Sequence, residues 1–155
     1  MSLRIKKHRE RRPSTWETVE EPLDVDAVLD RFSSPENLIL IDCLTVLVSN
    51  HLLHYTGPVD EANPSGVTTG NKIGETLFQE QVSDRILDRM HKIIGAFRKS
   101  PADVVAVTNE VGMGVVPPTP MGRVYRDLMG RVNQAFADTA DEFYVIFSGH
   151  PLRLK

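Results

Sequence analysis

The chain has 155 residues, 41% of them hydrophobic and 25% charged, with a formal net charge of −3. This composition suits one globular domain spanning residues 1–155, and the weak negative charge predicts no nucleic acid partner and no general attraction to anionic membranes. No apolar run approaches the roughly 18 residues that span a bilayer, residues 1–12 lack the apolar middle of a signal peptide, and a single cysteine excludes an internal disulfide, so we expect a cytoplasmic protein without a membrane span.

The chain opens with a basic segment, RIKKHRERR, at residues 4–12. Such a run is usually a solvated helix face or a nonspecific contact with phosphate or nucleic acid. The cations around His8 favour its neutral, nucleophilic imidazole, and the same cations can receive a phosphate. The residues of this segment alone favour an exposed bystander over a nucleophile.

The predicted elements after this segment alternate between helix and strand. In chain order they are a short strand at 16–20, a helix at 24–32, a strand at 37–44 running into a helix at 43–53, a loop at 54–75, a helix at about 79–98, a strand at 103–110, a helix at about 121–137, and a strand at 142–149. The loop is rich in Gly, Pro, Thr, Asn and Ser, and is predicted to be a flexible insertion rather than a functional lid.

The three longer strands are almost continuously apolar, a pattern typical of strands buried on both faces of a parallel sheet. With helices between them, they predict a three-layer α/β domain whose sheet is mostly parallel.

Ligands of parallel α/β sheets gather beyond the carboxyl ends of the strands, and two predicted strand ends carry suitable groups. Asp42 ends the strand LILID, where a carboxylate can support Mg²⁺ in phosphate transfer or can cap the following helix. Asn109 and Glu110 follow the strand at 103–110, where they can contact a ligand or only cap and turn the chain. Residue spacing favours the second alternative for Asn109 and Glu110. The histidines other than His8 show no metal-ligand spacing with carboxylates or with the cysteine, and no metal-ligand set is assigned. They are His51, His54, His91 and His150.

Four segments together resemble the adenosylcobinamide kinase/adenosylcobinamide-phosphate guanylyltransferase family of cobalamin biosynthesis. They are RIKKHRERRPSTWETVEEP, LILIDCLTVLVSN, VVAVTNEVGMGVVP and GRVNQAFADTADEFYVIFSG. The resemblance covers nearly the whole chain except the loop at 54–75. It implies an α/β nucleotide domain of the P-loop nucleotide-hydrolase type that forms a homotrimer.

The resemblance also implies a bifunctional enzyme. Such an enzyme phosphorylates adenosylcobinamide with GTP or ATP and Mg²⁺, then transfers GMP from GTP to adenosylcobinamide phosphate through a guanylylated histidine. By position, His8 matches that catalytic histidine. The nucleotide-binding residues implied in the same way are Arg9, Glu10, Arg11, Arg12, Glu20 and Asp42. Asn109 and Glu110 are expected to position substrate, while Gly112 and Gly114 are expected to serve backbone conformation.

One departure from the family concerns the phosphate-binding loop. The family begins with a strand and a G-x-x-x-x-G-K-[ST] loop that cradles phosphates, and this sequence has no such string. We therefore expect a chain without its first strand and P-loop, with little kinase activity and an open sheet edge. Two alternatives remain: a non-catalytic nucleotide-binding or regulatory module of the same fold, and a basic-armed nucleic-acid-binding domain.

Overall fold

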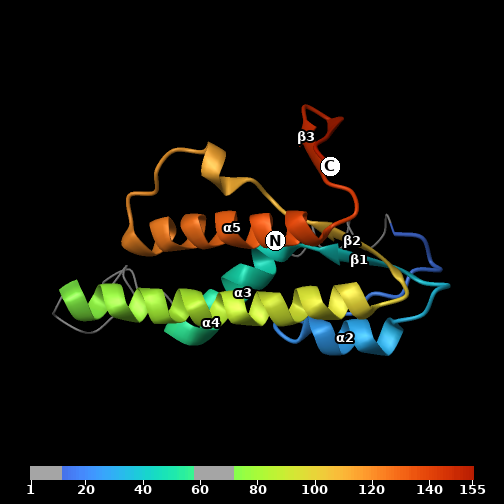
Figure 1. Cartoon of the computed structure of the whole chain (residues 1–155), viewed down its shortest axis with the longest axis horizontal. Helices are drawn as coiled ribbons and strands as arrows, with labels where there is room; N and C mark the ends of the chain where they lie inside the picture. The colour runs from blue at the N-terminus through green and yellow to red at the C-terminus, as the bar shows by residue number, and fades with distance from the viewer. Residues whose placement is uncertain (1–11, 58–71) are drawn as a thin grey trace.

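The computed structural model describes the backbone of residues 12–57 and 72–155, and the side chains of these ranges except 72–78. The elements in chain order are α2 (Val25–Phe32), β1 (Leu38–Asp42), α3 (Leu44–Thr56), α4 (Lys72–Lys99), β2 (Asp103–Val107), the 3-10 helix η1 (Val111–Met113), α5 (Pro120–Thr139), β3 (Tyr144–Phe147) and β4 (His150–Arg153). Figure 1 shows a mixture of helices and strands, including a parallel strand pair, so the predicted α/β class is confirmed.

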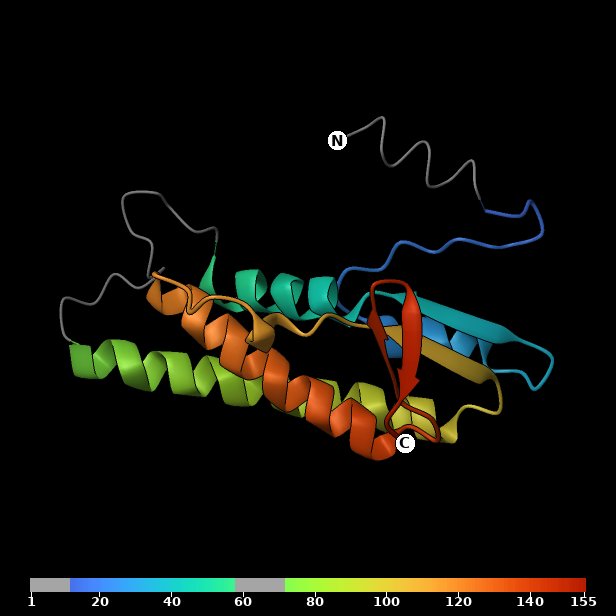
Figure 2. The same ribbon diagram turned by 90° about the horizontal axis from the view of Figure 1, so that it is seen from above.

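The core lies between α3, α4 and α5, with α4 and α5 running side by side (Figures 1 and 2). On α4 and α5, buried apolar residues recur at helical spacing: Val82, Ile86, Met90 and Ile93 on α4, and Met121, Leu128, Met129 and Val132 on α5. This period places each set on one face of its helix, and burying those faces is the main stabilising contribution. The rings of Phe97 and Phe136, 5.4 Å apart, join the C-terminal ends of the two helices.

The strands β1 and β2 pair in parallel, with Leu38 opposite Asp103 and Asp42 opposite Val107. On one face of this pair Ile41 packs against the helical core. The opposite face is exposed along its length, at Leu38, Leu40, Asp42, Asp103, Val105 and Val107. The described residues thus confirm the parallel pairing but cover only one face, where the sequence predicted burial on both.

The C-terminal strands form a separate antiparallel hairpin, in which Phe147 pairs with His150. The turn residues Ser148 and Gly149 have φ angles of 50° and 83°. Two successive positive φ angles suit the tight turns whose twist matches that of a hairpin. The prediction of a central parallel strand at 142–149 is therefore wrong. The Ser-Gly pair marks a chain reversal, and Ile146 is 62% exposed.

Other boundaries also differ from the prediction. Residues 16–20 form no strand, α3 continues to Thr56, and α4 already begins at Lys72, within the segment predicted as a loop. The strand predicted at 103–110 ends at Val107. Within the described parts of the chain, every helix is too short or too polar to cross a bilayer.

Candidate functional site

The carboxyl ends of β1 and β2 form a first candidate site, which we call the strand-end site: Asp42, Thr45, Asn109, Glu110 and Asn133. Asp42 ends β1 and lies opposite the last residue of β2. Asp42, Asn109 and Glu110 are all exposed. The parallel pairing therefore brings the two strand ends that the sequence analysis singled out to one edge of the sheet, where ligands of α/β sheets bind.

Thr45, in the first turn of α3, holds Asn109 in place after β2. The Thr45 hydroxyl oxygen accepts hydrogen bonds from the backbone N–H of Asn109 at 3.0 Å and from its side-chain amide at 3.1 Å. The Tyr125 hydroxyl of α5 donates to the Thr45 carbonyl at 3.0 Å. Burial raises the pKa of Tyr125, which keeps the hydroxyl protonated as a donor.

Asn133 on α5 holds the same turn from the other side. The residue is only 5% exposed, and its Oδ1 accepts a hydrogen bond from the Thr108 hydroxyl at 2.7 Å. Its Nδ2 donates to the Asn109 carbonyl at 3.1 Å and to Glu110 Oε1 at 2.9 Å. Because a buried amide is stable only when its polar atoms are paired, Asn133 fixes both the turn and one oxygen of the Glu110 carboxylate.

Two of the alternatives for these strand ends can be decided from this geometry. Helix α3 has Cys43 as its N-cap with no side-chain capping hydrogen bond, so the structure gives no support to Asp42 as its cap. Gly112 and Gly114 both lack a positive φ angle, and a Cβ atom at either position would meet no atom closer than 3.6 Å. The prediction that these glycines serve a special backbone conformation is therefore wrong, because other residues can adopt the same angles.

Residues 12–24, which we call the N-terminal arm, carry the second candidate site. Figure 2 shows the early part of the arm running apart from the helices before it reaches α2. Arg12 and Glu20, both predicted to bind nucleotide, line one open pocket together with Pro13, Ser14, Trp16 and Thr18; we call it the arm pocket. Arg12 Nη1 donates to the Thr18 hydroxyl at 3.0 Å, which orients the guanidinium in that pocket.

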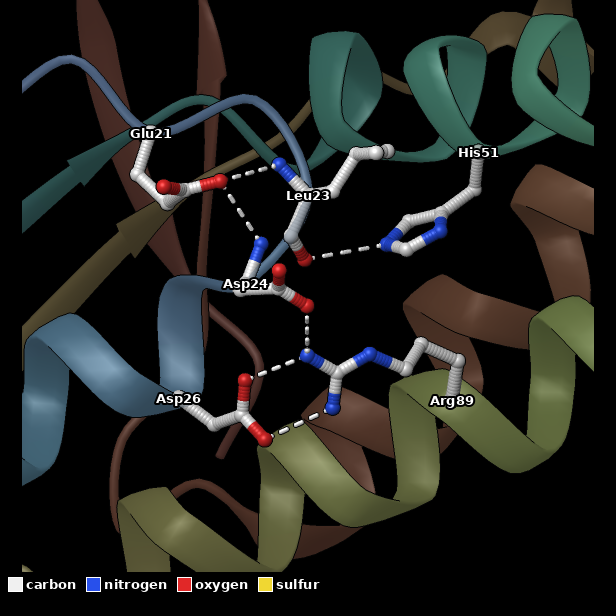
Figure 3. A network of polar contacts seen from close by, with 6 residues as sticks. All are labelled: Glu21, Leu23, Asp24, Asp26, His51 and Arg89. Carbon is white, nitrogen blue, oxygen red and sulfur yellow. Dashed lines mark hydrogen bonds and ion pairs between the residues drawn. The ribbon is translucent and has the colours of Figure 1, made fainter.

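The base of the arm is tied to α3 and α4 by the polar network in Figure 3. Glu21 Oε1 accepts from the backbone N–H groups of Leu23 and Asp24, each at 2.8 Å. Arg89 of α4 donates to Asp24 at 3.0 Å and binds both carboxylate oxygens of Asp26, one of them at 2.6 Å. An arginine that binds a carboxylate through two nitrogens fixes the orientation of the two side chains as well as their distance. Arg89 therefore fixes the position of the arm's C-terminal end relative to α4.

His51 of α3 completes this network from a buried position. Its Nε2 lies 3.2 Å from the Leu23 carbonyl, and its buried Nδ1 has no hydrogen-bond partner among the described residues. Burial lowers the pKa of His51, and the positive charge of Arg89 lowers it further. The ring is therefore neutral near pH 7, with Nε2–H donating to Leu23. The hydrogen bond from Arg89 likewise holds the pKa of Asp26 below its usual value.

The structure describes three of the seven predicted site residues, Arg12, Glu20 and Asp42, and places them at two separate sites. Arg12 and Glu20 lie together in the arm pocket. Asp42 lies at the strand-end site and does not line that pocket. The catalytic candidate His8 and the nucleotide-binding candidates Arg9, Glu10 and Arg11 lie outside the described residues.

The sequence analysis missed Thr45 and Asn133. Thr45 follows Asp42 by three residues, so the start of α3 after a strand-end acid could have identified it as a neighbour of the turn. Asn133 offered a weaker signal, a lone amide on the apolar face of a predicted helix. Only the packing of α5 against the strand ends shows which groups it contacts.

Comparison with known proteins adds a family relationship. The family model described as cobinamide kinase / cobinamide phosphate guanyltransferase matches residues 1–154. The chain is 34% identical over its full length to the bifunctional adenosylcobalamin biosynthesis protein CobU of Escherichia coli and 35% identical to that of Salmonella typhimurium, covering 78% of each. It is 30% identical to the bifunctional adenosylcobalamin biosynthesis protein CobP of Pseudomonas aeruginosa and covers 75% of it.

Proposed function

Because the chain belongs to the cobinamide kinase / cobinamide phosphate guanyltransferase family, we propose that it acts in adenosylcobalamin biosynthesis by transferring GMP from GTP to adenosylcobinamide phosphate. The observation that carries this proposal is the match over residues 1–154, which includes both the basic segment around His8 and the strand ends. The relatives named above are bifunctional biosynthetic proteins of the same pathway.

The proposed transfer has two steps and uses His8 as the nucleophile. A ring nitrogen of His8 attacks the α-phosphorus of GTP, the bond from that phosphorus to the β-bridging oxygen breaks, and pyrophosphate leaves. A phosphate oxygen of adenosylcobinamide phosphate then attacks the same phosphorus, the nitrogen–phosphorus bond breaks, and His8 is regenerated. A neutral imidazole suits this role because it is nucleophilic and its phosphoramidate remains reactive.

The basic segment at residues 4–12 and the N-terminal arm that follows it are proposed to bind the donor nucleotide. Arg9, Arg11 and Arg12 supply positive charge for the phosphates, and Arg12 is held in direction by Thr18. Glu10, in the same basic segment, is proposed to contact the nucleotide, and Glu20, which lines the arm pocket with Arg12, is proposed to bind the guanine nucleotide.

Mg²⁺ is proposed to bind with the nucleotide rather than to a protein cage. The described residues hold no group of three or more His, Cys, Asp or Glu side chains that could enclose a metal ion. Mg²⁺ commonly takes only one or two carboxylates and completes its shell with water and substrate phosphate oxygens. The exposed carboxylate of Asp42 fits this need, and the bound ion would supply charge neutralisation of the phosphates.

The kinase half of the family activity is proposed to be weak when residues 1–155 are assayed alone. The sequence contains no G-x-x-x-x-G-K-[ST] string, whose backbone amides and lysine cradle nucleotide phosphates in P-loop proteins. The same observation favours, as the alternative, a nucleotide-binding module of this fold without turnover. Assembly as a homotrimer is part of the proposal as well.

The test supplies purified chain with GTP, Mg²⁺ and adenosylcobinamide phosphate, and follows the guanylylated product by chromatography. Product formation that His8→Ala abolishes and a chelator prevents supports the proposal. His91→Ala is the matched control because this histidine is exposed on α4, and it should leave the rate unchanged. GTP binding without product would support the non-catalytic module. Rapid phosphorylation of adenosylcobinamide with ATP would contradict the weak-kinase part.

A further inference from the structure

The arm pocket contains an aromatic side chain to which the proposed function gives no role. Trp16 is the single tryptophan of the chain, lines the pocket beside Arg12 and Glu20, and is 52% exposed. The arm shapes this pocket locally, because the backbone N–H of Trp16 donates to the Pro13 carbonyl at 3.0 Å and the Arg12 guanidinium donates to the Thr18 hydroxyl. The position of Trp16 in the pocket is therefore set by a backbone turn, and a side-chain hydrogen bond between Arg12 and Thr18 holds the arm around it.

Three of the side chains that line the pocket, those of Arg12, Trp16 and Glu20, complement a purine nucleotide. Trp16 is about half exposed and lines the pocket, so its indole can offer a flat base a stacking surface. Base–aromatic stacking contributes substantially to nucleic acid binding whatever the base. The guanidinium of Arg12 suits an attached phosphate. The carboxylate of Glu20 is an acceptor of hydrogen bonds from N–H groups.

We propose that Trp16 is the platform on which the base of the nucleotide stacks, and that Glu20 selects guanine over adenine at its edge. Guanine presents two adjacent donors, N1–H and the 2-amino group, to a carboxylate. Adenine presents a bare acceptor at N1 and no 2-amino group, so a carboxylate there repels it. This inference rests on the proposed function for the identity of the nucleotide and adds the residue that stacks on the base.

GMP and AMP are the probes, because neither can donate a nucleotidyl group. Since Trp16 is the only tryptophan, its fluorescence reports directly on the arm pocket. We expect saturable quenching by GMP and at least about tenfold weaker binding of AMP. Glu20→Gln should reduce the GMP/AMP affinity ratio by about tenfold, because the neutral amide presents a donor as well as an acceptor.

The role of Trp16 itself is tested by calorimetry, which needs no fluorophore. Trp16→Ala should weaken GMP binding by about tenfold or more, while Trp16→Phe should retain most of the affinity because it keeps an aromatic face. Phe147→Ala is the matched control, since Phe147 is 50% exposed in β3 and lies outside the pocket. It should bind GMP as the unmodified chain does.

Two outcomes would overturn the inference: equal binding of GMP and AMP, or a Trp16→Ala variant that binds GMP unchanged. Failure of the proposed function is distinguishable from either outcome. His8→Ala should lose guanylyl transfer yet keep GMP binding and quenching. If Trp16 does not bind the base, the unmodified chain can still be tested for guanylyl transfer.

Discussion

At the residue scale, Asn133 shows how one buried amide organises the strand-end site. Asn133→Ala removes a donor and an acceptor that pair with Thr108, Asn109 and Glu110. A hydrogen bond of this kind contributes about 0.5–1.5 kcal/mol net, so losing the set should lower the free energy of unfolding in urea by about 1–3 kcal/mol. Gln134→Ala is the control because its exposed neighbour position on α5 involves no such bonds, and it should change stability little. Equal loss in both variants would show that helix propensity, not this network, is responsible.

His51 predicts a pH dependence of stability. Its folded-state pKa is lowered by burial, so the unfolded chain binds a proton more readily. The stability is fully present above the ordinary histidine pKa of about 6.5 and is lost as pH falls from there through the lower folded value. His51→Gln keeps an N–H donor for Leu23 but cannot be protonated. Urea unfolding between about pH 7.5 and pH 5.5 should therefore show a shallower decline in this variant.

The matched control for His51 is His91→Gln, an exposed histidine of α4 that should keep the pH slope of the unmodified chain. Identical slopes in all three proteins would mean that acid sensitivity arises elsewhere in the chain.

At the element scale, the junction between the N-terminal arm, α2 and α4 depends on Arg89. Arg89→Met should lower the free energy of unfolding by about 1–2 kcal/mol, because charge-assisted hydrogen bonds are lost but the Asp26 side chain is 28% exposed and partly screened. The Asp26 pKa is lowered in the folded state, so this contribution is present above about pH 4 and is lost as pH falls below it. Denaturant titration of both proteins above and below about pH 4 measures the loss of unfolding free energy and shows whether it disappears in acid.

Arg85→Met on the exposed face of α4 is the control for Arg89, and it should leave the unfolding midpoint nearly unchanged. A loss as large as that of Arg89→Met would assign the effect to helix charge rather than to the arm junction.

Local sequence patterns correctly predicted those helices and strands whose formation does not depend on residues elsewhere in the chain. The helical spacing from Val82 to Ile93 and the apolar strand LILID were read correctly as a helix and a strand. The segment at 142–149 was misread because its apolar residues resemble a central strand, while its pairing is decided by the turn at Ser148 and Gly149.

At the candidate site, the sequence could place Asp42 and Glu110 at the ends of predicted strands. It could not show that Asn133, 23 residues beyond Glu110, holds that carboxylate.

At the scale of the whole molecule, one face of the β1–β2 pair is apolar and, among the described residues, is left exposed to solvent. Leu38, Leu40, Val105 and Val107 on this face are each at least 42% exposed. Exposed apolar faces and open strand edges favour association, so sedimentation should show concentration-dependent self-association. Leu40→Lys, in the middle of the face, should weaken this self-association. Val46→Lys on α3, also an exposed apolar position, should leave the self-association unchanged. A chain that stays monomeric at all concentrations would contradict this reading of the face.

Mass spectrometry of the chain after incubation with GTP and Mg²⁺ shows whether His8 carries GMP during transfer. We expect one added guanylyl group, localised to His8, stable in base and labile in acid as a phosphoramidate is. The adduct should be absent from His8→Ala, retained in His91→Ala, and discharged by adenosylcobinamide phosphate. A guanylyl group on another residue, or none at all while guanylylated cobinamide still accumulates, would contradict the account.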